Sequence, residues 1–575
     1  MKVFQIGFNK CGTKFLTQLF DLNGYRGIHW EGGKLANDII YSKASGSPPL
    51  KPWVGEYTVF TDMESVHRYG QPLLEGYKEF EYLDKSFPDS VFILNTRDVE
   101  DWIISRYMHQ NGAYANFYAQ HYKVEIDQLA DIWHKDWIDH IAACRQYFSR
   151  NEKFIEINID TAEPEDYRQT LLKWFNLPVC PPLPDKAVLS KRQSYLNQLK
   201  KILWTKEKKH KFTPDEIDYW ARILTNSSIP HVQKTQAEDF KACSQIFAKF
   251  SVKSASITKQ DGTSWPILEA GPGVYVSEKR KDKLYRIVGI VNEISQITNE
   301  GTYNIDLQDG RQLGVSESNK TGAPVITYCR RQFAENVYLF PLPEYHSIGS
   351  DYFPGKINKD ERSFKDKLDR VVWRGSLSGP CSDVKNGVFS SPSHQVLDKI
   401  VKSSDNSLNL NNPLRQNVRF SFVSENFGKE GFDVAITSCP ATIAAFTKIK
   451  MDHLLDNFRR ENFIYKHRYI VSLRGYDTGS NFLMGADSQS VVFKEEDGWE
   501  VFYSLLFKPW EHYIPLEAGA VDVEEKLSWA RLNYDECQKI SLRARMACSV
   551  LANHEIRKKY LDMLLSSYRN ECGNF

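Results

Sequence analysis

The N-terminus of the chain encodes a strand, a glycine-containing loop and a helix in immediate succession. Residues 3–7 form a short apolar run typical of a strand, and apolar residues recur at helical spacing over residues 13–22. The loop between them contains Gly7, Lys10 and Gly12. This arrangement aims backbone N–H groups at one point, where an anion binds well, and Lys10 adds a positive charge there. The segment therefore predicts a phosphate-binding loop.

The order of residues in this loop separates two classes of phosphate-binding protein. Nucleoside triphosphatases use the pattern G-x-x-x-x-G-K-[ST], in which a lysine directly follows the second glycine. Here Thr13 and Lys14 follow Gly12, and the important lysine is Lys10, inside the loop. The pattern resembles the phosphosulfate loop of the sulfotransferases, usually G-x-x-K-x-G-T-[TS], although Lys14 stands where that family has Thr or Ser. A different phosphate loop, or none, is the alternative interpretation.

A second segment extends the resemblance. Residues 91–95 form an apolar strand, and Asp98 is suited to cap the helix that follows. In sulfotransferases an arginine ends this strand, and a serine eight positions later joins it on the 3′-phosphate of the cofactor. Arg97 and Ser105 have that spacing, and a guanidinium and a hydroxyl supply suitable donors. The resemblance covers the chain to about residue 190.

The resemblance implies transfer of a sulfuryl group from 3′-phosphoadenosine 5′-phosphosulfate (PAPS) to an acceptor hydroxyl. This reaction needs a cation that holds charge on the leaving phosphate, a role that suits Lys10 as a catalytic residue. The residues that the resemblance assigns to PAPS binding are Gly7, Asn9, Lys10, Gly12, Thr13, Lys14, Arg97 and Ser105.

The base that deprotonates the acceptor is predicted between the two phosphate motifs. Related enzymes use a histidine or a carboxylate at this place. Asp62, in the strand-like stretch 59–64, is the favoured base, and Glu64 is the second catalytic candidate. His29 and Asp38 are weaker choices, and a solvated loop carboxylate is the alternative role for Asp62.

Composition limits the classes of partner and the compartment. The 575 residues include 74 Lys and Arg against 73 Asp and Glu, so bulk charge does not indicate nucleic-acid binding. No stretch approaches 18 apolar residues, the N-terminus begins directly with the loop strand, and the ten cysteines are scattered. We therefore expect a cytoplasmic protein. A basic run over residues 199–211 is expected to be a solvated linker helix, with peripheral docking on the inner membrane face as the alternative.

The C-terminal half contains short apolar runs between helical patterns, which favours α/β units with parallel sheets. The predicted strands are residues 285–291, 337–340, 371–373, 418–423, 432–436, 469–473 and 490–493. Two such units side by side would form a cleft for a nucleotide donor near the carboxyl ends of their strands.

Several segments of this half resemble one enzyme family. They are Val-Trp-Arg-Gly-Ser over residues 372–376, the segment 467–482 and the segment 508–516. Their order and spacing resemble the family of protein O-glucosyltransferases and lipopolysaccharide-modifying glycosyltransferases, which includes the capsule xylosyltransferases. The resemblance covers about residues 280–560. It implies the two-lobed glycosyltransferase B fold, a UDP-sugar donor, inversion at the anomeric carbon and no metal.

The resemblance also assigns roles to individual residues. Residues expected to bind the nucleotide are Arg374, Gly375, Ser376, Arg474, Asp477, Ser480 and Asn481. Inversion requires a base that takes the proton of the acceptor hydroxyl. Glu344 is the predicted base because it follows a strand of the first lobe, and Asp433 is the fallback. His512 and Tyr513 are expected to be core residues, and the Cys439-Pro440 turn to be structural.

The predicted architecture is α/β throughout. A P-loop-like sulfotransferase domain with a parallel sheet spans residues 1–190, and a helical linker spans 191–245. A two-lobed, Rossmann-like glycosyltransferase follows, with its N-terminal lobe over 246–372 and its UDP-sugar-binding lobe over 373–575. The predicted function is a bifunctional transferase that acts on a glycan or glycolipid, such as a lipopolysaccharide or capsule precursor. The alternatives are a single activity with the other domain serving only to bind or dock, and a nucleotide-triphosphate switch, which the loop order disfavours.

Overall fold

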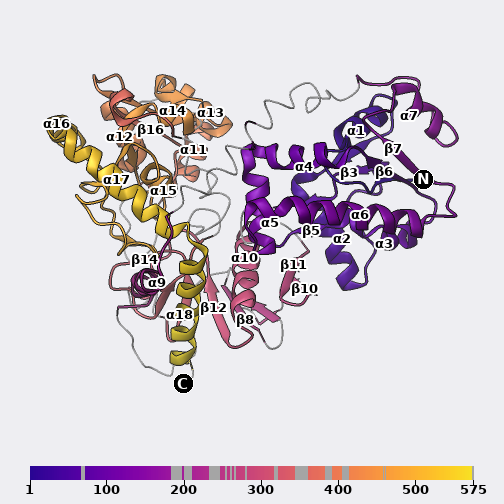
Figure 1. The fold of residues 1–575 in the computed structure, drawn as a ribbon. Coiled ribbons are helices and arrows are strands. Elements are labelled where there is room, and N and C mark those ends of the chain that lie inside the picture. Colours follow the sequence, from indigo (N-terminus) through magenta and orange to yellow (C-terminus); the bar gives the residue numbers. More distant parts are fainter. Residues whose placement is uncertain are drawn as a thin grey trace.

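The computed structural model describes most of the chain. The described residues are 1–66, 71–182, 197, 199, 210–231, 247–252, 256–259, 262–263, 267–278, 282–315, 321–342, 360–381, 391–403, 413–457, 459 and 461–572. An N-terminal domain and a larger C-terminal half make up the fold, and the described residues of that half contain two large sheets and two two-stranded ones (Figure 1). The α/β architecture predicted from the sequence is confirmed. Predicted residue Glu344 and nearly all of the basic run 199–211 lie outside the described residues.

The N-terminal domain is built on a five-stranded parallel sheet in the order β2-β3-β1-β6-β7. Its strands are β1 (Val3–Gln5), β2 (Gly27–His29), β3 (Val59–Thr61), β6 (Val91–Thr96) and β7 (Phe154–Asn158). Its helices are α1 (Thr13–Asp21), α2 (Lys34–Ser45), α3 (Phe80–Ser86), α4 (Val99–Met108), α5 (Ala113–Tyr122), α6 (Leu129–Tyr147) and α7 (Pro164–Leu171). Because all five strands are parallel, their carboxyl ends lie at one edge of the sheet.

Two apolar clusters cover the faces of this sheet. One contains Phe4, Phe92 and Trp102, and the other contains Val3, Leu16 and Ile93. Successive residues of β1 and β6 therefore enter opposite clusters, as expected for a strand that is buried on both faces. The predicted N-cap of α4 is confirmed, because the Asp98 side chain accepts a hydrogen bond from the backbone N–H of Asp101 at 2.9 Å.

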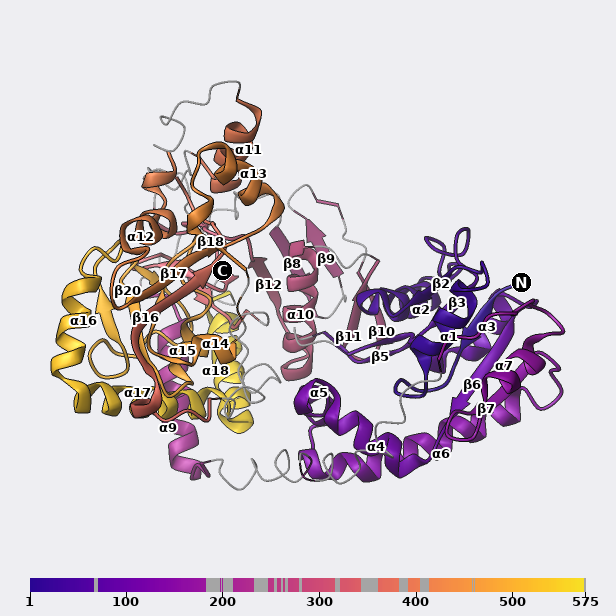
Figure 2. The same cartoon turned by 90° about the horizontal axis from the view of Figure 1, so that it is seen from above.

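The N-terminal domain contacts the C-terminal half through α2 and a β-hairpin, β10 (Ile267–Gly271) and β11 (Val274–Ser277). Ala36, Leu74 and Val276 form a small apolar cluster there. The side-chain amide of Asn37 donates to the Ser277 carbonyl at 2.8 Å, and that of Gln71 donates to the Tyr285 carbonyl at 2.8 Å. Figure 2 shows this hairpin beside α2.

The first lobe of the C-terminal half contains a five-stranded mixed sheet in the order β15-β13-β12-β8-β9. Its strands are β8 (Phe247–Ser251), β9 (Ser256–Lys259), β12 (Thr302–Asp306), β13 (Val325–Thr327) and β15 (Val337–Leu339). Helices α9 (Pro214–Ser228), α10 (Asp282–Ile297) and α18 (His554–Cys572) belong to the same core. The chain thus returns to the first lobe at its C-terminal helix, where Tyr568 donates to the Pro324 carbonyl at 2.8 Å.

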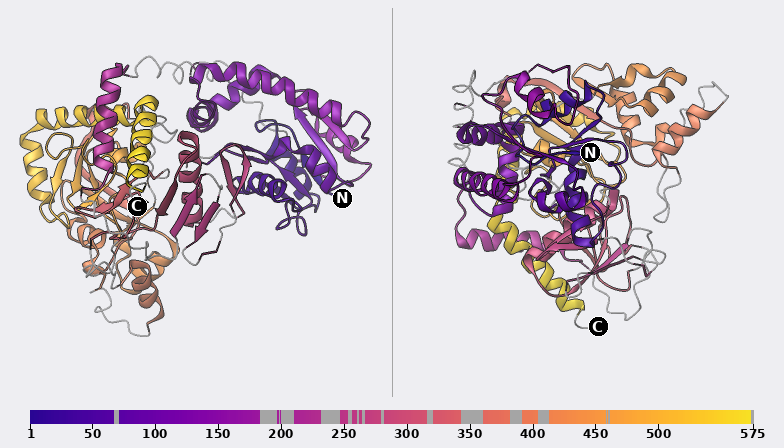
Figure 3. Two further views of the ribbon diagram at one scale, coloured as in Figure 1. Left: turned by 90° about the horizontal axis from the view of Figure 1, so that it is seen from below. Right: turned by 90° about the vertical axis from the view of Figure 1, so that its right-hand side faces the viewer.

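The second lobe is a six-stranded parallel sheet in the order β18-β17-β16-β19-β20-β22. The strands are β16 (Leu368–Gly375), β17 (Phe432–Thr437), β18 (Leu455–Asp456), β19 (His467–Ser472), β20 (Val491–Glu495) and β22 (Ile514–Leu516). The helices are α11 (Ser393–Lys402), α12 (Val418–Asn426), α13 (Pro440–Lys448), α14 (Glu461–Ile464), α15 (Phe482–Ala486), α16 (Val523–Leu532) and α17 (Tyr534–Leu551). Figure 3 shows both halves from two further sides. The predicted lobe boundary at residues 372/373 falls inside β16.

Two predicted strands are wrong. Residues 285–291 lie in α10, where the buried side chains continue at helical spacing to Ile294. Residues 418–423 lie in α12, because the side chain of Asn417 caps the helix by accepting from the backbone N–H groups of Arg419 and Phe420. The other five predicted strands coincide with β15, β16, β17, β19 and β20.

Candidate active sites

The predicted phosphate loop connects β1 to α1 at the carboxyl edge of the first sheet. Gly7 passes so close to β6 that an added Cβ would lie 2.6 Å from the Asn95 carbonyl oxygen. Gly12, at the N-cap of α1, has φ 77°, a left-handed conformation that glycine adopts without strain. The Asn95 side chain donates to the Cys11 carbonyl at 2.8 Å. The neighbouring strand therefore fixes the path of the loop.

Lys10 lies half-buried in the loop, and its Nζ is 2.8 Å from Nδ1 of His109. Burial lowers the pKa of Lys10, and it lowers that of His109 to about 4. The neutral ring of His109 therefore accepts the hydrogen bond from the ammonium of Lys10. His109 was not predicted to belong to the site, although it follows Ser105 by about one helical turn.

Arg97 follows β6 and contacts the loop from the side opposite to β3. Its Nη1 donates to the Lys10 carbonyl at 3.0 Å, and its Nη2 lies 3.8 Å from a carboxylate oxygen of Asp160. Its Nε is buried and has no hydrogen-bond partner among the described residues. Ser105 is half-buried on α4, the helix that follows Arg97. One buried donor of this arginine therefore has no partner in the described part of the chain.

Asp62 and His29 lie at the ends of adjacent strands, β3 and β2, with 3.5 Å between Oδ2 of Asp62 and Nε2 of His29. Burial, with a smaller contribution from Glu64, raises the pKa of Asp62 to about 7, against the opposing charges of Lys10 and Lys14. Burial lowers the pKa of His29 to about 4. Near neutral pH, Asp62 is thus the group of this pair that exchanges a proton.

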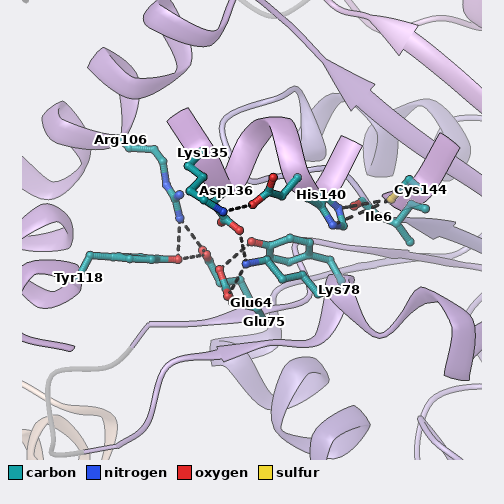
Figure 4. Close-up of polar contacts among 12 residues, drawn as sticks. Ile6, Glu64, Glu75, Lys78, Arg106, Tyr118, Lys135, Asp136, His140 and Cys144 are labelled. Atoms are coloured by element: carbon teal, nitrogen blue, oxygen red, sulfur yellow. Dashed lines mark hydrogen bonds and ion pairs between the residues drawn. The ribbon is translucent and has the colours of Figure 1, made fainter. Parts of the chain in front are cut away.

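Asn9 and Glu64 point into the protein beneath the loop. Glu64 is 3% exposed, and it accepts hydrogen bonds from Asn9 at 2.8 Å, from Arg106 at 3.1 Å and from Tyr114 at 2.8 Å. Tyr118 donates to it as well (Figure 4). Glu64 therefore anchors the loop through its hydrogen bond with Asn9, and all these partners are buried side chains.

The remaining predicted residues of this domain lie at different depths. Thr13 is buried, and Lys14 is exposed on the first turn of α1. Asp38 lies on α2 and accepts a hydrogen bond from the backbone N–H of Leu50 at 2.6 Å. The structure therefore brings Lys10, Asp62 and Arg97 to one edge of the sheet. Asp38 lies on α2 instead, hydrogen-bonded to the backbone of Leu50.

In the second lobe, Arg374 is held by carboxylates of its own sheet. Its Nη2 donates to Asp433 at 2.6 Å and its Nε to Asp456 at 2.9 Å, and its side chain is 8% exposed. His467 lies 3.2 Å from the other carboxylate oxygen of Asp433. Hydrogen bonds from His467 and Arg374 hold the pKa of Asp433 well below its usual range. Arg374 and Asp433 therefore stabilise each other within the lobe.

The loops that follow β16 and β19 meet at the carboxyl edge of the second sheet. Arg419, which was not predicted, donates to the Ser376 carbonyl at 2.9 Å and to the Arg474 carbonyl at 2.9 Å. An added Cβ at Gly475 would lie 2.7 Å from the Ser378 hydroxyl. Arg419 thereby joins the two loops that contain predicted nucleotide-binding residues.

Side chains of these loops have different surroundings. Arg474 lies 3.3 Å from a carboxylate oxygen of the buried Glu495 and is 34% exposed. Ser376 and Ser480 are exposed, and Gly375 is half-buried. The side-chain amide of Asn481 donates to the Val471 carbonyl at 2.9 Å.

Asp477 connects the two lobes of the C-terminal half. Its carboxylate accepts from the Tyr328 hydroxyl at 2.5 Å and from the backbone N–H of Gly310 at 3.2 Å, both in the first lobe. Burial raises the pKa of Asp477 to about 6. The Tyr328 hydroxyl also lies 2.9 Å from Asp309, which binds Arg286 at 2.7 Å. Asp477 therefore faces the opposite lobe.

Among the described residues, no group of three or more His, Cys, Asp or Glu side chains is arranged to hold a metal ion. No helix in the same part of the chain is long and apolar enough to cross a membrane. Tyr513 is buried and donates to Glu496 at 2.8 Å, and Nδ1 of His512 accepts from the backbone N–H of Lys508 at 3.1 Å.

Two parts of the chain match families of group-transferring enzymes. Residues 2–170 match the family described as Sulfotransferase domain, and residues 429–571 match Glycosyl transferase family 90. The chain thus contains a sulfotransferase domain followed by a glycosyltransferase domain, as the sequence motifs predicted.

Curated relatives match parts of the chain. Human protein O-glucosyltransferase 3 is 27% identical over 101 residues, which are 17% of this chain and 20% of that protein. Rat protein O-glucosyltransferase 1 is 33% identical over 91 residues, which are 16% of this chain and 21% of that protein. The uncharacterized protein 035R of invertebrate iridescent virus 3 is 21% identical over 281 residues, covering 47% of this chain and 23% of that protein. The matched segments span a quarter or less of these relatives.

Proposed function

We propose that the N-terminal domain transfers a sulfuryl group from PAPS to a hydroxyl of a glycan or glycolipid. The observation that carries this proposal is the convergence of Lys10, Arg97 and Asp62 on one edge of a parallel sheet, around a loop that an anion fits. Arg97 has a buried Nε donor without a partner among the described residues, as expected for a side chain that binds a phosphate.

Each residue has a role in this reaction. Asp62 accepts the proton of the acceptor hydroxyl, whose oxygen forms the new bond to sulfur. The bond between sulfur and the bridging phosphate oxygen breaks, and its electron pair stays on that oxygen, where Lys10 stabilises the charge. Arg97 and Ser105 bind the 3′-phosphate. A carboxyl whose pKa is about 7 suits the base, because a catalytic base works best near the operating pH.

Calorimetric titration with adenosine 3′,5′-bisphosphate tests this assignment. The wild-type chain should bind the bisphosphate more tightly than adenosine 5′-monophosphate, because only the bisphosphate carries the group for Arg97. We expect Arg97→Gln to abolish this difference in affinity. Lys10→Ala should weaken the binding of both nucleotides. Equal binding of both nucleotides by the wild-type protein would exclude the proposed role of Arg97.

We further propose that the C-terminal half transfers a sugar from a UDP-sugar, with inversion and without a metal, in a two-lobed glycosyltransferase B fold. The family match and the meeting of the β16 and β19 loops at the carboxyl edge of the sheet support this assignment. We assign the diphosphate to Arg474, Ser376 and Ser480, because Arg374 is already bound by two carboxylates. Glu344 stays the predicted base.

Titration with UDP tests the second assignment. Arg474→Gln should weaken UDP binding about tenfold or more, as expected when a charged hydrogen bond to phosphate is lost. The control is Lys508→Gln, at an exposed site of the same lobe, which should leave the UDP affinity unchanged. Binding of only one of the two nucleotides would support the alternative, in which the silent domain only binds or docks. The shared acceptor and the cytoplasmic, membrane-peripheral location are part of the same proposal.

A further inference from the structure

The loop of residues 474–481, the nucleotide loop, follows β19 and is bound at both ends and in its middle. At one end the backbone N–H of Arg474 donates to the side chain of Glu495 on β20 at 3.0 Å. At the other end the Asn481 amide donates to a backbone carbonyl of β19 at 2.9 Å. Asp477 lies between these two anchors and is bound by the first lobe. The position of the loop therefore depends on contacts from both lobes.

The contact in the middle of the loop lacks one proton when Asp477 is ionised. The Tyr328 oxygen lies 2.5 Å from a carboxylate oxygen of Asp477 and 2.9 Å from one of Asp309. A hydroxyl has one proton, so it can donate to only one of two ionised carboxylates, and the other contact then brings two acceptor oxygens together. Arg286, at 2.7 Å, favours the charged form of Asp309. Asp477 is therefore the carboxyl of this pair that can hold a further proton.

Protonation of Asp477 completes the network. The Asp477 hydroxyl then donates to the Tyr328 oxygen, and the Tyr328 hydroxyl donates to Asp309. Burial, with a contribution from the charge of Asp309, raises the pKa of Asp477 to about 6. Hydrogen bonds from Tyr328 and the backbone of Gly310 and the charge of Arg286 act in the opposite direction. The contact between the loop and the first lobe thus gains or loses one proton near pH 6.

Other charged or titratable groups surround Asp477 and its loop. They are Cys329 in the first lobe and His394, Arg419, Glu495 and Asp497 in the second. Burial keeps the pKa of Cys329 well above its usual value, and it raises the pKa of Asp497 to about 6. His394 contacts the loop, with 3.3 Å between its Nδ1 and the Tyr476 hydroxyl. Replacing Asp477 alone leaves all these groups in place, so their effects can be separated from its own.

We propose that Tyr328 positions the nucleotide loop through a proton that it shares with Asp477, and that the protonated arrangement binds the diphosphate of the donor. The inference rests on the proposed transfer from a UDP-sugar, in which Arg474 and Ser480 bind the diphosphate on either side of Asp477. Loss of the proton sets the carboxylates of Asp477 and Asp309 against each other across the two lobes. Donor affinity should therefore fall as the pH rises through about 6. Tyr328 and Asp477 act through the loop and are positioning residues.

Calorimetric titration of the full chain at pH 5 and pH 8 tests this inference. The probe is the methyl ester of UDP, because its diphosphate, unlike that of UDP, has no proton to lose between these pH values. We expect the wild-type protein to bind it at least about fivefold more tightly at pH 5 than at pH 8. Asp477→Asn should bind at both pH values as the wild type does at pH 5, because the amide donates to Tyr328 as the protonated carboxyl does. Tyr328→Phe should bind at pH 5 as weakly as the wild type does at pH 8.

The matched controls are Asp398→Asn and Tyr219→Phe, because both side chains are exposed, on α11 and α9. Each control should keep the wild-type affinity at both pH values. The opposite effects expected for Asp477→Asn and Tyr328→Phe are the signature of a shared proton. A merely structural contact would predict weaker binding in both variants at both pH values, and that result would overturn the inference.

Three other results are informative. Equal binding at pH 5 and pH 8 by the wild type, or a pH dependence that persists in Asp477→Asn and so comes from Asp497 or His394, would overturn the inference alone. A pH dependence that persists in Tyr328→Phe would show that the charge of Asp477 acts on the diphosphate directly, and it would overturn the role of Tyr328. Failure of the wild-type chain to bind the methyl ester at either pH would instead refute the proposed function, and the inference with it.

Discussion

Replacing Asp62 by asparagine should stabilise the N-terminal domain at neutral and alkaline pH while it removes sulfuryl transfer. The pKa of Asp62 is raised from 3.8 to about 7, mainly by burial. The folded state therefore binds this proton more tightly than the unfolded state, and stability falls as the pH rises from about 4 to about 7. A shift of roughly three pKa units corresponds to about 4 kcal/mol that the ionised carboxylate costs above pH 7.

Asparagine is a suitable probe of this cost. It has the shape of the aspartate without the charge, and it tolerates the left-handed backbone of residue 62, whose φ is 53°. Hydrogen exchange of β1 and β6 peptides in the full chain measures the local free energy of opening. At pH 8 we expect protection in Asp62→Asn to exceed that of the wild type by up to about a thousandfold, and at pH 4 the two should be equal.

The control for this experiment is Asp89→Asn, because the Asp89 side chain is 90% exposed. It should change protection little at either pH. A difference between Asp62→Asn and wild type that does not vary with pH would refute the reasoning, because the effect would then not come from ionisation of the carboxyl. Lower protection in Asp62→Asn at pH 8 would show that the carboxylate stabilises the fold.

Three further predictions concern activity and packing. The kcat/KM of sulfuryl transfer should rise with pH through about 7, because Asp62 must be ionised to act as a base, and rate measurements between pH 5 and 9 should show this rise. Arg106→Met should destabilise the N-terminal domain by about 3–5 kcal/mol in the same exchange experiment, since it leaves the buried Glu64 carboxylate without its cation, and Glu64→Gln in the same chain should restore part of the loss. Arg374→Gln should lower the stability of the second lobe, seen as faster exchange of β17 peptides, yet change UDP affinity less than twofold. Loss of UDP binding at unchanged stability would contradict the structural role of Arg374.

Local features of the fold could be predicted from the sequence. The strand, loop and helix of residues 3–22, the N-cap of α4 at Asp98 and five of the seven strands of the C-terminal half depend on neighbouring residues, and the structure has them. The two errors arose because apolar runs of six or seven residues fit a strand or a buried helix face equally well. In α12 the cap residue Asn417 decides between them.

Roles that depend on distant partners could not be predicted. Arg374 ends a strand, as a phosphate-binding arginine would, but its carboxylate partners are 59 and 82 residues away in the sequence. His109 meets Lys10 across 99 residues. The burial of Glu64 beneath the loop likewise depends on Tyr114 and Tyr118 of α5, which donate hydrogen bonds to it across 50 and 54 residues.

The central claim is that one chain carries two separate nucleotide-dependent transfer sites. Native mass spectrometry of the full chain with adenosine 3′,5′-bisphosphate and UDP, alone and together, tests it most directly. We predict that one molecule of each nucleotide binds per chain at the same time. Lys10→Ala should remove binding of the bisphosphate only, and Arg474→Gln should weaken binding of UDP only. Competition between the two nucleotides, or loss of both in one variant, would contradict the account.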